Sequence, residues 1–301
     1  MRLSVIVPCY NEERSLDEFH DRLTKLLNNN GISYEIIMID DGSRDDTYKK
    51  IKELNNKDKN VKGISFSKNF GKESAMYAGL SHASGEYITI MDADMQHTPE
   101  TLLEMYTKLI SNPDYDVVCA YKESRRDERP LKRFLTAIYY RIINKISDIN
   151  LLPGAGDFRV FKKSVKDAIL MLPEKTRFLK GIFSWVGYNT IYVPYKPEKR
   201  KYGSSKWSIY KLTKYALGGI ISFSTIPIKS IFILGLIIFG IGFLNFILLG
   251  HLSYKTIILF LSFIMLSLGV ISLYVSRIYS NILNRPCFII KEEIGFKKDK
   301  K

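Results

Sequence analysis

Two aspartates separated by a single residue lie in the stretch IMDADMQHTPE, residues 90–100, where a short apolar run ends. Asp92 and Asp94 are followed by Gln96, so two carboxylates and an amide oxygen lie close together. Oxygen ligands of this kind select Mg²⁺ or Mn²⁺, which keep open coordination positions for substrate phosphates. A buried strand that merely reaches solvent would also end in polar residues. His97, beside the motif, is expected to be structural rather than a metal ligand.

A second polar cluster, DDGS at residues 40–43, also follows an apolar run. A carboxylate at Asp40 could accept hydrogen bonds from a nucleoside base or from ribose hydroxyls, and the glycine permits a tight turn. The same cluster could instead cap a helix that begins near Asp45. The segment VPCYNEE adds side chains that could pack against a base or accept a further hydrogen bond: Pro8, Tyr10 and Glu12.

The first 120 residues alternate apolar runs with amphipathic segments, and this alternation places the polar clusters. Apolar runs typical of buried strands occupy residues 3–8, 35–40, 61–66, 86–92 and 116–120. Helical spacing occupies residues 15–27, 45–54, 72–83 and 99–110. Strands buried on both faces and separated by helices predict an α/β domain with a mostly parallel sheet. Ligands of such sheets bind beyond the carboxyl ends of the strands, where the polar clusters fall.

Two long runs without a charged residue follow, at residues 230–250 and 256–276. As a helix, each run would span about 31 Å, close to the thickness of a bilayer core. One such run could be a buried helix of a soluble protein. Two of them, joined by the short link HLSYK, predict a transmembrane hairpin with spans at about 229–250 and 256–277.

The balance of charge is basic, with 45 Lys and Arg against 31 Asp and Glu and a formal net charge of +14. Basic residues flank the apolar runs, whereas the hairpin loop contains only Lys255. The positive-inside rule therefore puts the domain at 1–225, both termini and a basic tail at 281–301 in the cytosol. The N-terminus lacks the apolar stretch of a signal peptide. An anionic lipid surface explains the charge better than nucleic acid does.

Two basic amphipathic segments, at about 130–147 and 205–222, are expected to form helices. The first gathers its apolar side chains on one face: Leu131, Phe134, Leu135, Ile138, Ile142 and Ile146. Such a helix could pack on its own domain or lie in the membrane interface. The second segment directly precedes the first apolar run, and this position favours the interface. Three cysteines without paired spacing support neither a disulfide framework nor a zinc site.

Several segments together resemble the GT-A glycosyltransferases of family 2: VIVPCYNEE, IDDGSRDDT, NFGKESAMYAGLSHASGEYITIMDADMQHTPE, GDFRVF and RKYGSSKW. More narrowly, the chain is similar to the polyprenyl-phosphate glycosyltransferases, which include bactoprenol glucosyltransferases and dolichol-phosphate mannose synthases. The resemblance covers about residues 3–280, and the hairpin after GSSKW matches the bactoprenol branch. The sequence lacks the Q-x-x-R-W signature of the processive cellulose and hyaluronan synthases, which implies transfer of a single sugar.

The resemblance implies a nucleotide-sugar donor, UDP-glucose or UDP-N-acetylglucosamine, whose nucleoside is held by Pro8, Tyr10, Glu12 and Asp40. It implies that Mg²⁺ or Mn²⁺, and through it the donor diphosphate, is held by Asp92, Asp94 and Gln96. Asp94 then has a catalytic role as well. Arg200 and Lys206, in RKYGSSKW, would reach the phosphates from a loop.

On the acceptor side, the resemblance implies a catalytic or orienting role for Asp157 in GDFR. This carboxylate could orient a donor hydroxyl, take a proton, or simply pair with Arg159. A basic group would bind the acceptor phosphate: Arg125, Arg126, Arg129 and Arg133.

The implied reaction is an inverting transfer to polyprenyl phosphate, such as undecaprenyl phosphate, at the cytoplasmic membrane for cell-envelope glycosylation. A separate flippase and a downstream glycosyltransferase would handle the product. Gly235, Gly240 and Gly242 would allow close packing of the spans and a homo-oligomer. Two alternatives stay open: a transferase acting on a lipid or glycan hydroxyl, and a catalytically inactive membrane scaffold.

Overall fold

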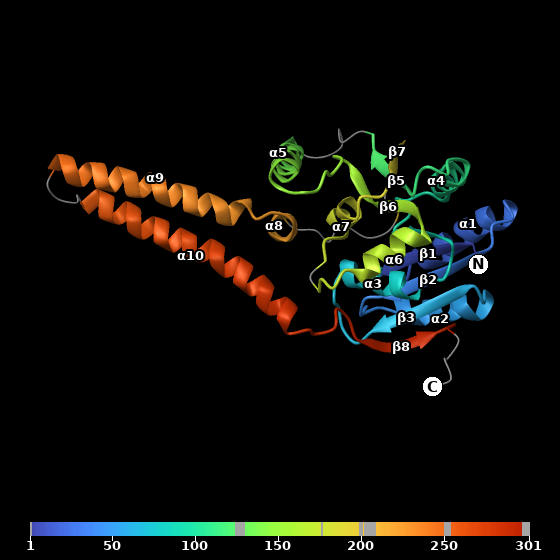
Figure 1. The fold of residues 1–301 in the computed structure, drawn as a ribbon. Helices are drawn as coiled ribbons and strands as arrows, with labels where there is room; N and C mark the ends of the chain where they lie inside the picture. The colour runs from blue at the N-terminus through green and yellow to red at the C-terminus, as the bar shows by residue number, and fades with distance from the viewer. Residues whose placement is uncertain are drawn as a thin grey trace.

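The computed structural model describes residues 2–123, 130–175, 177–198, 201, 209–249 and 254–296. An α/β body carries two long helices that run side by side and extend away from it (Figure 1). Helices cover both faces of the central sheet, and the C-terminal segment returns from the long helices to the edge of that sheet (Figure 1). The body therefore holds both ends of the projecting pair.

The sheet has eight strands among the described residues, in the order β7-β5-β6-β4-β1-β2-β3-β8. Their bounds are β1 Leu3–Cys9, β2 Tyr34–Asp40, β3 Val61–Phe66, β4 Tyr87–Ile90, β5 Val117–Lys122, β6 Ala155–Lys162, β7 Thr190–Tyr195 and β8 Ile290–Ile294. Strands β4, β1, β2 and β3 are mutually parallel, and β7 is parallel to β5. Strand β6 is antiparallel to both β4 and β5, and β8 is antiparallel to β3. The carboxyl ends of β1, β2, β3 and β4 thus share one edge with the start of β6.

The helices are α1 Leu16–Asn29, α2 Thr47–Lys57, α3 Lys72–His82, α4 Pro99–Ser111, α5 Pro130–Ile146, α6 Lys163–Met171, α7 Leu179–Trp185, α8 Ile209–Phe223, α9 Ile226–Leu249 and α10 Tyr254–Ile282. Side chains of α1, α2 and α4 build the core on one face of the sheet. Side chains of α3, α6 and α7 build the core on the other face. The strands between them are apolar on both faces because both faces are covered.

The elements predicted within the first 120 residues are confirmed, and each predicted segment overlaps the corresponding strand or helix, with ends that differ by up to three residues. Strand β2 is buried along its whole length, and β1 is buried at six of its seven positions. This complete burial is the reason that these strands are continuous apolar runs rather than alternating ones. The α/β fold with a mostly parallel sheet follows from that pattern.

The stretch that sequence analysis treats as a basic tail, residues 281–301, differs from that expectation because it contains β8. This strand closes the open side of β3, where Lys52 Nζ lies 2.7 Å from Glu292. Phe288 stacks on Phe66 with ring centroids 5.0 Å apart. A covered edge strand no longer offers unpaired backbone groups to other chains. The segment after α10 is therefore part of the α/β body.

Helices α9 and α10 are long and apolar enough to cross a membrane, and only 6% of each apolar window is buried. They form the projecting pair in Figure 1. Gly242 of α9 faces the ring of Phe260 on α10, where a β-carbon would approach to 2.3 Å. The glycine therefore permits close contact inside the hairpin, which is one of the contacts that sequence analysis attributes to these glycines.

The apolar face of α5 is exposed, with Phe134 at 62% and Leu135 at 50% exposure. Ile143, which lies off that face, is fully buried and ties the helix to the body. Within the described residues, Phe134 and Leu135 are not covered by the α/β body. An apolar face left uncovered beside two candidate spans fits an interfacial helix.

Candidate active site

The loops that follow β1 and β2 are tied to each other at the carboxyl edge of the sheet. Cys9 pairs in register with Asp40, and the backbone N–H of Asp41 donates to the carbonyl of Cys9 at 2.9 Å. The N–H of Asn11 donates to Ser43 Oγ at 2.9 Å, and Asn11 adopts φ 53, a left-handed conformation that asparagine tolerates. The structure thus brings together the predicted nucleoside residues Pro8, Tyr10, Glu12 and Asp40.

Asp40 is buried and has a structural role in addition to any role in binding. Its two carboxylate oxygens accept hydrogen bonds from Ser43 N and from Ser65 Oγ, both at 2.9 Å. Sequence analysis also considered that the cluster at residues 40–43 caps the next helix, α2. Asp40 and Ser43 do not occupy the N-cap position of that helix. Helix α2 has Asp46 at its N-cap position without a side-chain cap, and Asp45 accepts from Thr47 N.

Asp41, next to it, holds the loop between β3 and α3. Its carboxylate accepts hydrogen bonds from the N–H groups of Phe70 at 2.7 Å and Gly71 at 2.9 Å. Burial raises the pKa of Asp41 to about 6, although these hydrogen bonds oppose the rise. Gly71 has φ 96, which only glycine adopts easily, and α3 begins at the following residue. The anchor sets where α3 starts, and so where Lys72 stands.

The loop after β4 carries the predicted metal motif. Asp94 is buried, and its Oδ1 accepts from Gln96 N at 3.1 Å in a turn made possible by a φ of 66 at Met95. His97 accepts the N–H of Asp92 on Nδ1 at 3.0 Å and stacks on Phe158 with ring centroids 4.4 Å apart. Nδ1 of His97 is therefore occupied by a hydrogen bond within the loop. Burial lowers the pKa of the imidazole.

Lys72 joins the metal motif to Asp157, and sequence analysis assigned it no role. Its Nζ lies 2.7 Å from Asp92 Oδ1 and 3.1 Å from Asp157 Oδ2. The antiparallel register of β4 and β6 ends at the pair Ile90 and Arg159, and its continuation puts Asp157 opposite Asp92. The sequence signal was the polar segment SKNFGKE after the third strand, whose second lysine, the first residue of α3, is a cation available to pair with the acids.

The charges in this cluster offset one another. Burial by itself raises the pKa of Asp157, but Lys72, Lys180 and Arg159 outweigh it and hold that pKa well below its usual range. Lys72 keeps its proton, because Asp92 and Asp157 raise its pKa against the effect of burial. Sequence analysis allowed for a pair between Asp157 and Arg159. In the structure, Arg159 Nη2 instead donates to Gly156 O at 2.6 Å. Asp157 is therefore a fixed carboxylate with low basicity.

Glu73, the neighbour of Lys72, connects the site to the helix that precedes the candidate spans. Its carboxylate accepts from Tyr215 Oη of α8 at 2.9 Å and from Leu179 N at 3.0 Å. Burial raises the pKa of Glu73 from 4.5 to about 7. Between these values the folded chain retains a proton that the unfolded chain has lost, so this group makes the fold less stable as pH rises through that window.

A Glu73→Gln variant is neutral at every pH, so its apparent Tm relative to wild type should rise as the pH goes from about 5 to about 8. Thermal unfolding of both proteins in detergent, followed across this range, checks the expectation. Tyr215→Phe removes a donor from the carboxylate and should deepen the pH dependence of the Tm. A constant Tm difference between Glu73→Gln and wild type would contradict the assignment.

The donor set of the β4 loop fits a hard divalent cation. Asp92 and Asp94 offer carboxylate oxygens and Gln96 offers an amide oxygen, all of the type that Mg²⁺ and Mn²⁺ prefer. Within the described residues there is no group of three His, Cys, Asp or Glu side chains that could hold a metal. A site of this kind is completed by substrate phosphates rather than by the protein alone.

Several residues of the predicted site cannot be placed beside this cluster. Arg125, Arg126, Arg129, Arg200 and Lys206 lie outside the described residues. Arg133 is described, and it is exposed on α5. The described part of the predicted site therefore comprises the residues predicted to bind the donor and the metal, together with Asp157 and Lys72.

Comparison with known proteins identifies the family to which the chain belongs. Residues 4–170 match the family model described as glycosyl transferase family 2. An uncharacterized glycosyltransferase of Synechocystis is 38% identical over 98% of this chain and 96% of that protein. A prophage-derived bactoprenol glucosyl transferase of Shigella flexneri is 36% identical over 97% of this chain and 98% of that protein.

Among solved structures, the chain is similar to glucosyl-3-phosphoglycerate synthase from Mycobacterium tuberculosis, in a crystal structure with Mn²⁺, UDP and phosphoglyceric acid. The TM-score is 0.51 at 18% identity, over 73% of this chain and 76% of that one. The likeness shows the fold, an α/β sheet of the GT-A type. From the family model and the near-full-length relatives, we conclude that the chain belongs to glycosyl transferase family 2 and is a glycosyltransferase homologous to the bactoprenol glucosyl transferases.

Proposed function

We propose that this enzyme moves one sugar from a nucleotide-sugar to polyprenyl phosphate at the membrane surface, with inversion at the anomeric carbon. Relatives named bactoprenol glucosyl transferases match 97% of this chain, so the match includes the apolar helices as well as the sheet. UDP-glucose is the first donor to test, because those relatives are named for glucose.

The observation that carries the proposal is the salt bridge between Asp157 and Lys72. A sugar or lipid hydroxyl is protonated at neutral pH and needs a general base to react. Asp157 is a weak base, since nearby cations hold its pKa well below the usual range although burial alone would raise it. A phosphate monoester has a second pKa near 6 and arrives largely ionised. The site therefore suits a phosphate acceptor better than a hydroxyl acceptor.

On the donor side, Pro8, Tyr10, Glu12 and Asp40 would hold the nucleoside where the β1 and β2 loops meet. Asp92, Asp94 and Gln96 would hold Mg²⁺ or Mn²⁺. When bound, such an ion offsets the negative charge that develops on the departing diphosphate. Lys72 keeps Asp92 and Asp157 ionised and fixed in position. Arg200 and Lys206 remain proposed partners of the donor phosphates, and the arginine group at 125–133 remains a proposed partner of the acceptor.

The long helices support a location in the cytoplasmic membrane. Helices α9 and α10 would span it as a hairpin, with the catalytic domain and both termini in the cytosol. The uncovered apolar face of α5 would rest in the interface, where Phe134 and Leu135 could enter the headgroup region. A polyprenyl phosphate keeps its tail in the bilayer, so this arrangement holds the enzyme where the acceptor head emerges.

The proposal is tested with membranes containing the enzyme, Mg²⁺ or Mn²⁺, and a panel of radiolabelled nucleotide-sugars. Label should enter organic solvent with undecaprenyl phosphate and not with undecaprenol. Asp157→Asn should reduce that transfer about tenfold without abolishing it, because an ionised acceptor needs no strong base. Transfer to undecaprenol, together with complete loss in Asp157→Asn, would instead support the hydroxyl-acceptor alternative.

A further inference from the structure

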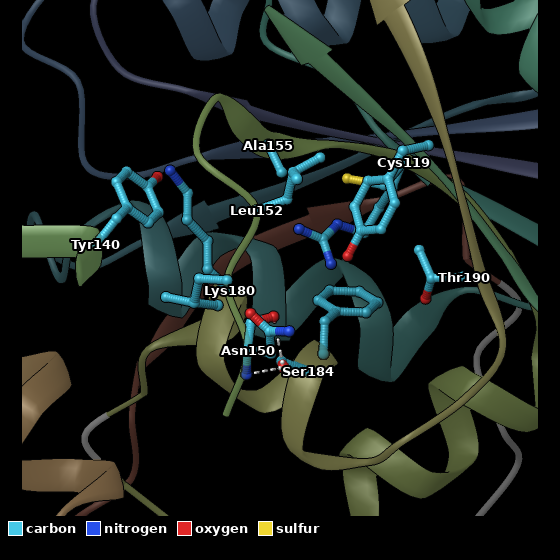
Figure 2. Close-up of a pocket in the computed structure, with 12 residues that line it drawn as sticks. Cys119, Tyr140, Asn150, Leu152, Ala155, Lys180, Ser184 and Thr190 are labelled. Carbon is cyan, nitrogen blue, oxygen red and sulfur yellow. Dashed lines mark hydrogen bonds between the residues drawn. The ribbon is translucent and has the colours of Figure 1, made fainter. Parts of the chain in front are cut away.

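A pocket is lined on one side by Lys180 and Ser184 of α7 (Figure 2). The strand β6 contributes Ala155 and Arg159 to its lining, so Asp157 lies between two lining residues in the chain. The remaining lining residues come from β5, β7, α5, α7 and the loop before β6: Cys119, Tyr140, Asn150, Leu151, Leu152, Lys180, Phe183, Ser184, Thr190 and Tyr192. The pocket therefore lies between β6, the strand that carries Asp157, and α5, the helix whose Phe134 and Leu135 are exposed.

The pocket contains a buried cation whose hydrogen bonds are incomplete. Arg159 is only 6% exposed, and its guanidinium lies 4.0 Å from the ring centroid of Phe183. Its Nη2 donates to Gly156 O, but its Nε is buried without a hydrogen-bond partner among the described residues. A buried donor without a partner is costly and indicates that something else satisfies it.

Lys180 supplies a second cation at the same place. The Lys180 side chain extends from α7 into the pocket, toward Tyr140 (Figure 2). Lys180 forms no salt bridge with any carboxylate of the described part of the chain. Lys180 and Arg159 both line the pocket, and their charges help to lower the pKa of Asp157.

The other walls of the pocket are apolar or aromatic, including Leu151, Leu152 and Phe183. An inorganic anion would gain nothing from such walls. A ligand with an anionic head and a hydrocarbon chain could use the cations and the walls together.

We propose that this pocket binds the head of the polyprenyl phosphate acceptor, with Lys180 and Arg159 on the phosphate and the first isoprene unit against Leu152 and Phe183. The inference rests on the proposed function, because the ligand is the acceptor of that reaction. It assigns the phosphate to two residues outside the arginine group of residues 125–133. The phosphate would sit beside Asp157, whose own charge is offset by Lys72.

The test uses the purified full-length enzyme in detergent and calorimetric titration with farnesyl phosphate, farnesol and inorganic phosphate. Farnesyl phosphate should bind well, and the other two probes weakly. Lys180→Gln should weaken farnesyl phosphate binding about tenfold, as expected for the loss of one charged hydrogen bond. Lys180→Arg should restore it. Lys163→Gln, at an exposed position at the start of α6, should bind as wild type does.

A kinetic measurement separates this inference from the proposed function. Lys180→Gln should raise the KM for the lipid phosphate about tenfold and leave the KM for the nucleotide-sugar unchanged. If farnesyl phosphate binding depends on Lys180 but no nucleotide-sugar is used, the pocket stands and the proposed reaction fails. If undecaprenyl phosphate is glycosylated but Lys180→Gln binds farnesyl phosphate as wild type does, the pocket assignment is overturned. Equal binding of inorganic phosphate would overturn the role of the apolar walls.

Discussion

An Asp94→Ala variant should lose sugar transfer by about 10³-fold or more, the largest effect expected in this enzyme. Asp94 is buried at the carboxyl end of β4, and its carboxylate is oriented by the N–H of Gln96. If it holds the divalent cation, its removal withdraws several kcal/mol of charge stabilisation from the departing diphosphate, and about 4 kcal/mol corresponds to about 10³-fold in rate. The loss should appear in kcat more than in the KM for the acceptor.

The measurement is the rate of label transfer to undecaprenyl phosphate across a range of Mn²⁺ concentrations. A second readout is independent of turnover: Mn²⁺ binding by the purified enzyme with UDP, followed by electron paramagnetic resonance, should weaken in Asp94→Ala. Asp114→Ala, at an exposed position in the loop before β5, is the matched control and should behave as wild type does. Full Mn²⁺ binding by Asp94→Ala would remove this residue from the metal site.

A Lys72→Met variant should reduce transfer about 10²- to 10³-fold. Methionine keeps the length of the side chain but removes the charge that lies 2.7 Å from Asp92 and 3.1 Å from Asp157. The two carboxylates then lose the cation that lies between them, and each hydrogen bond to a charged group typically contributes about 1.5–3 kcal/mol. Part of that cost should appear as displacement of Asp92 and Asp157 from the positions in which they act.

Two variants separate the charge of Lys72 from its bulk. Lys72→Arg keeps a cation and should retain more activity than Lys72→Met. Lys68→Met changes an exposed lysine of the same loop and should leave the rate unchanged. The rates are measured at saturating nucleotide-sugar, and circular dichroism checks that each variant is folded. Equal rates for Lys72→Met and wild type would show that the bridge contributes little to the reaction.

The strands and helices of the first 120 residues could be predicted because their signals are local. Strand β2 reads as YEIIMID and is buried along its whole length, which makes it an unbroken apolar run. Helices α1 and α4 show their apolar residues at helical spacing, because one face of each packs on the sheet. The polar cluster after each strand was equally visible, since parallel strands with helical crossovers end at one edge.

Strands β6, β7 and β8 were not predicted, and the signals of β6 and β8 were weak. Strand β8 is a short edge strand with the sequence IKEEI, and three of its five residues are exposed. Its charged side chains are typical of a solvated tail. Only the pairing with β3, which the sequence does not show, identifies the segment as a strand. Strand β6 begins with AGDFR, where the first positions are only partly buried and the residues serve the site. Elements whose burial depends on distant partners leave little trace in local periodicity.

By itself, the amino-acid sequence determined the α/β order of the body, the two apolar helices and the acidic motif after β4. These depend on burial, which selects residue types at fixed local spacing. Only the tertiary structure decided that Lys72 lies between Asp92 and Asp157, and that Lys180 and Arg159 share a pocket beside them. Lys72 and Asp157 are 85 residues apart, and they meet because β6 runs antiparallel to β4 while α3 packs on the same face. No local pattern encodes such a contact, since it depends on strand order and on the register between strands.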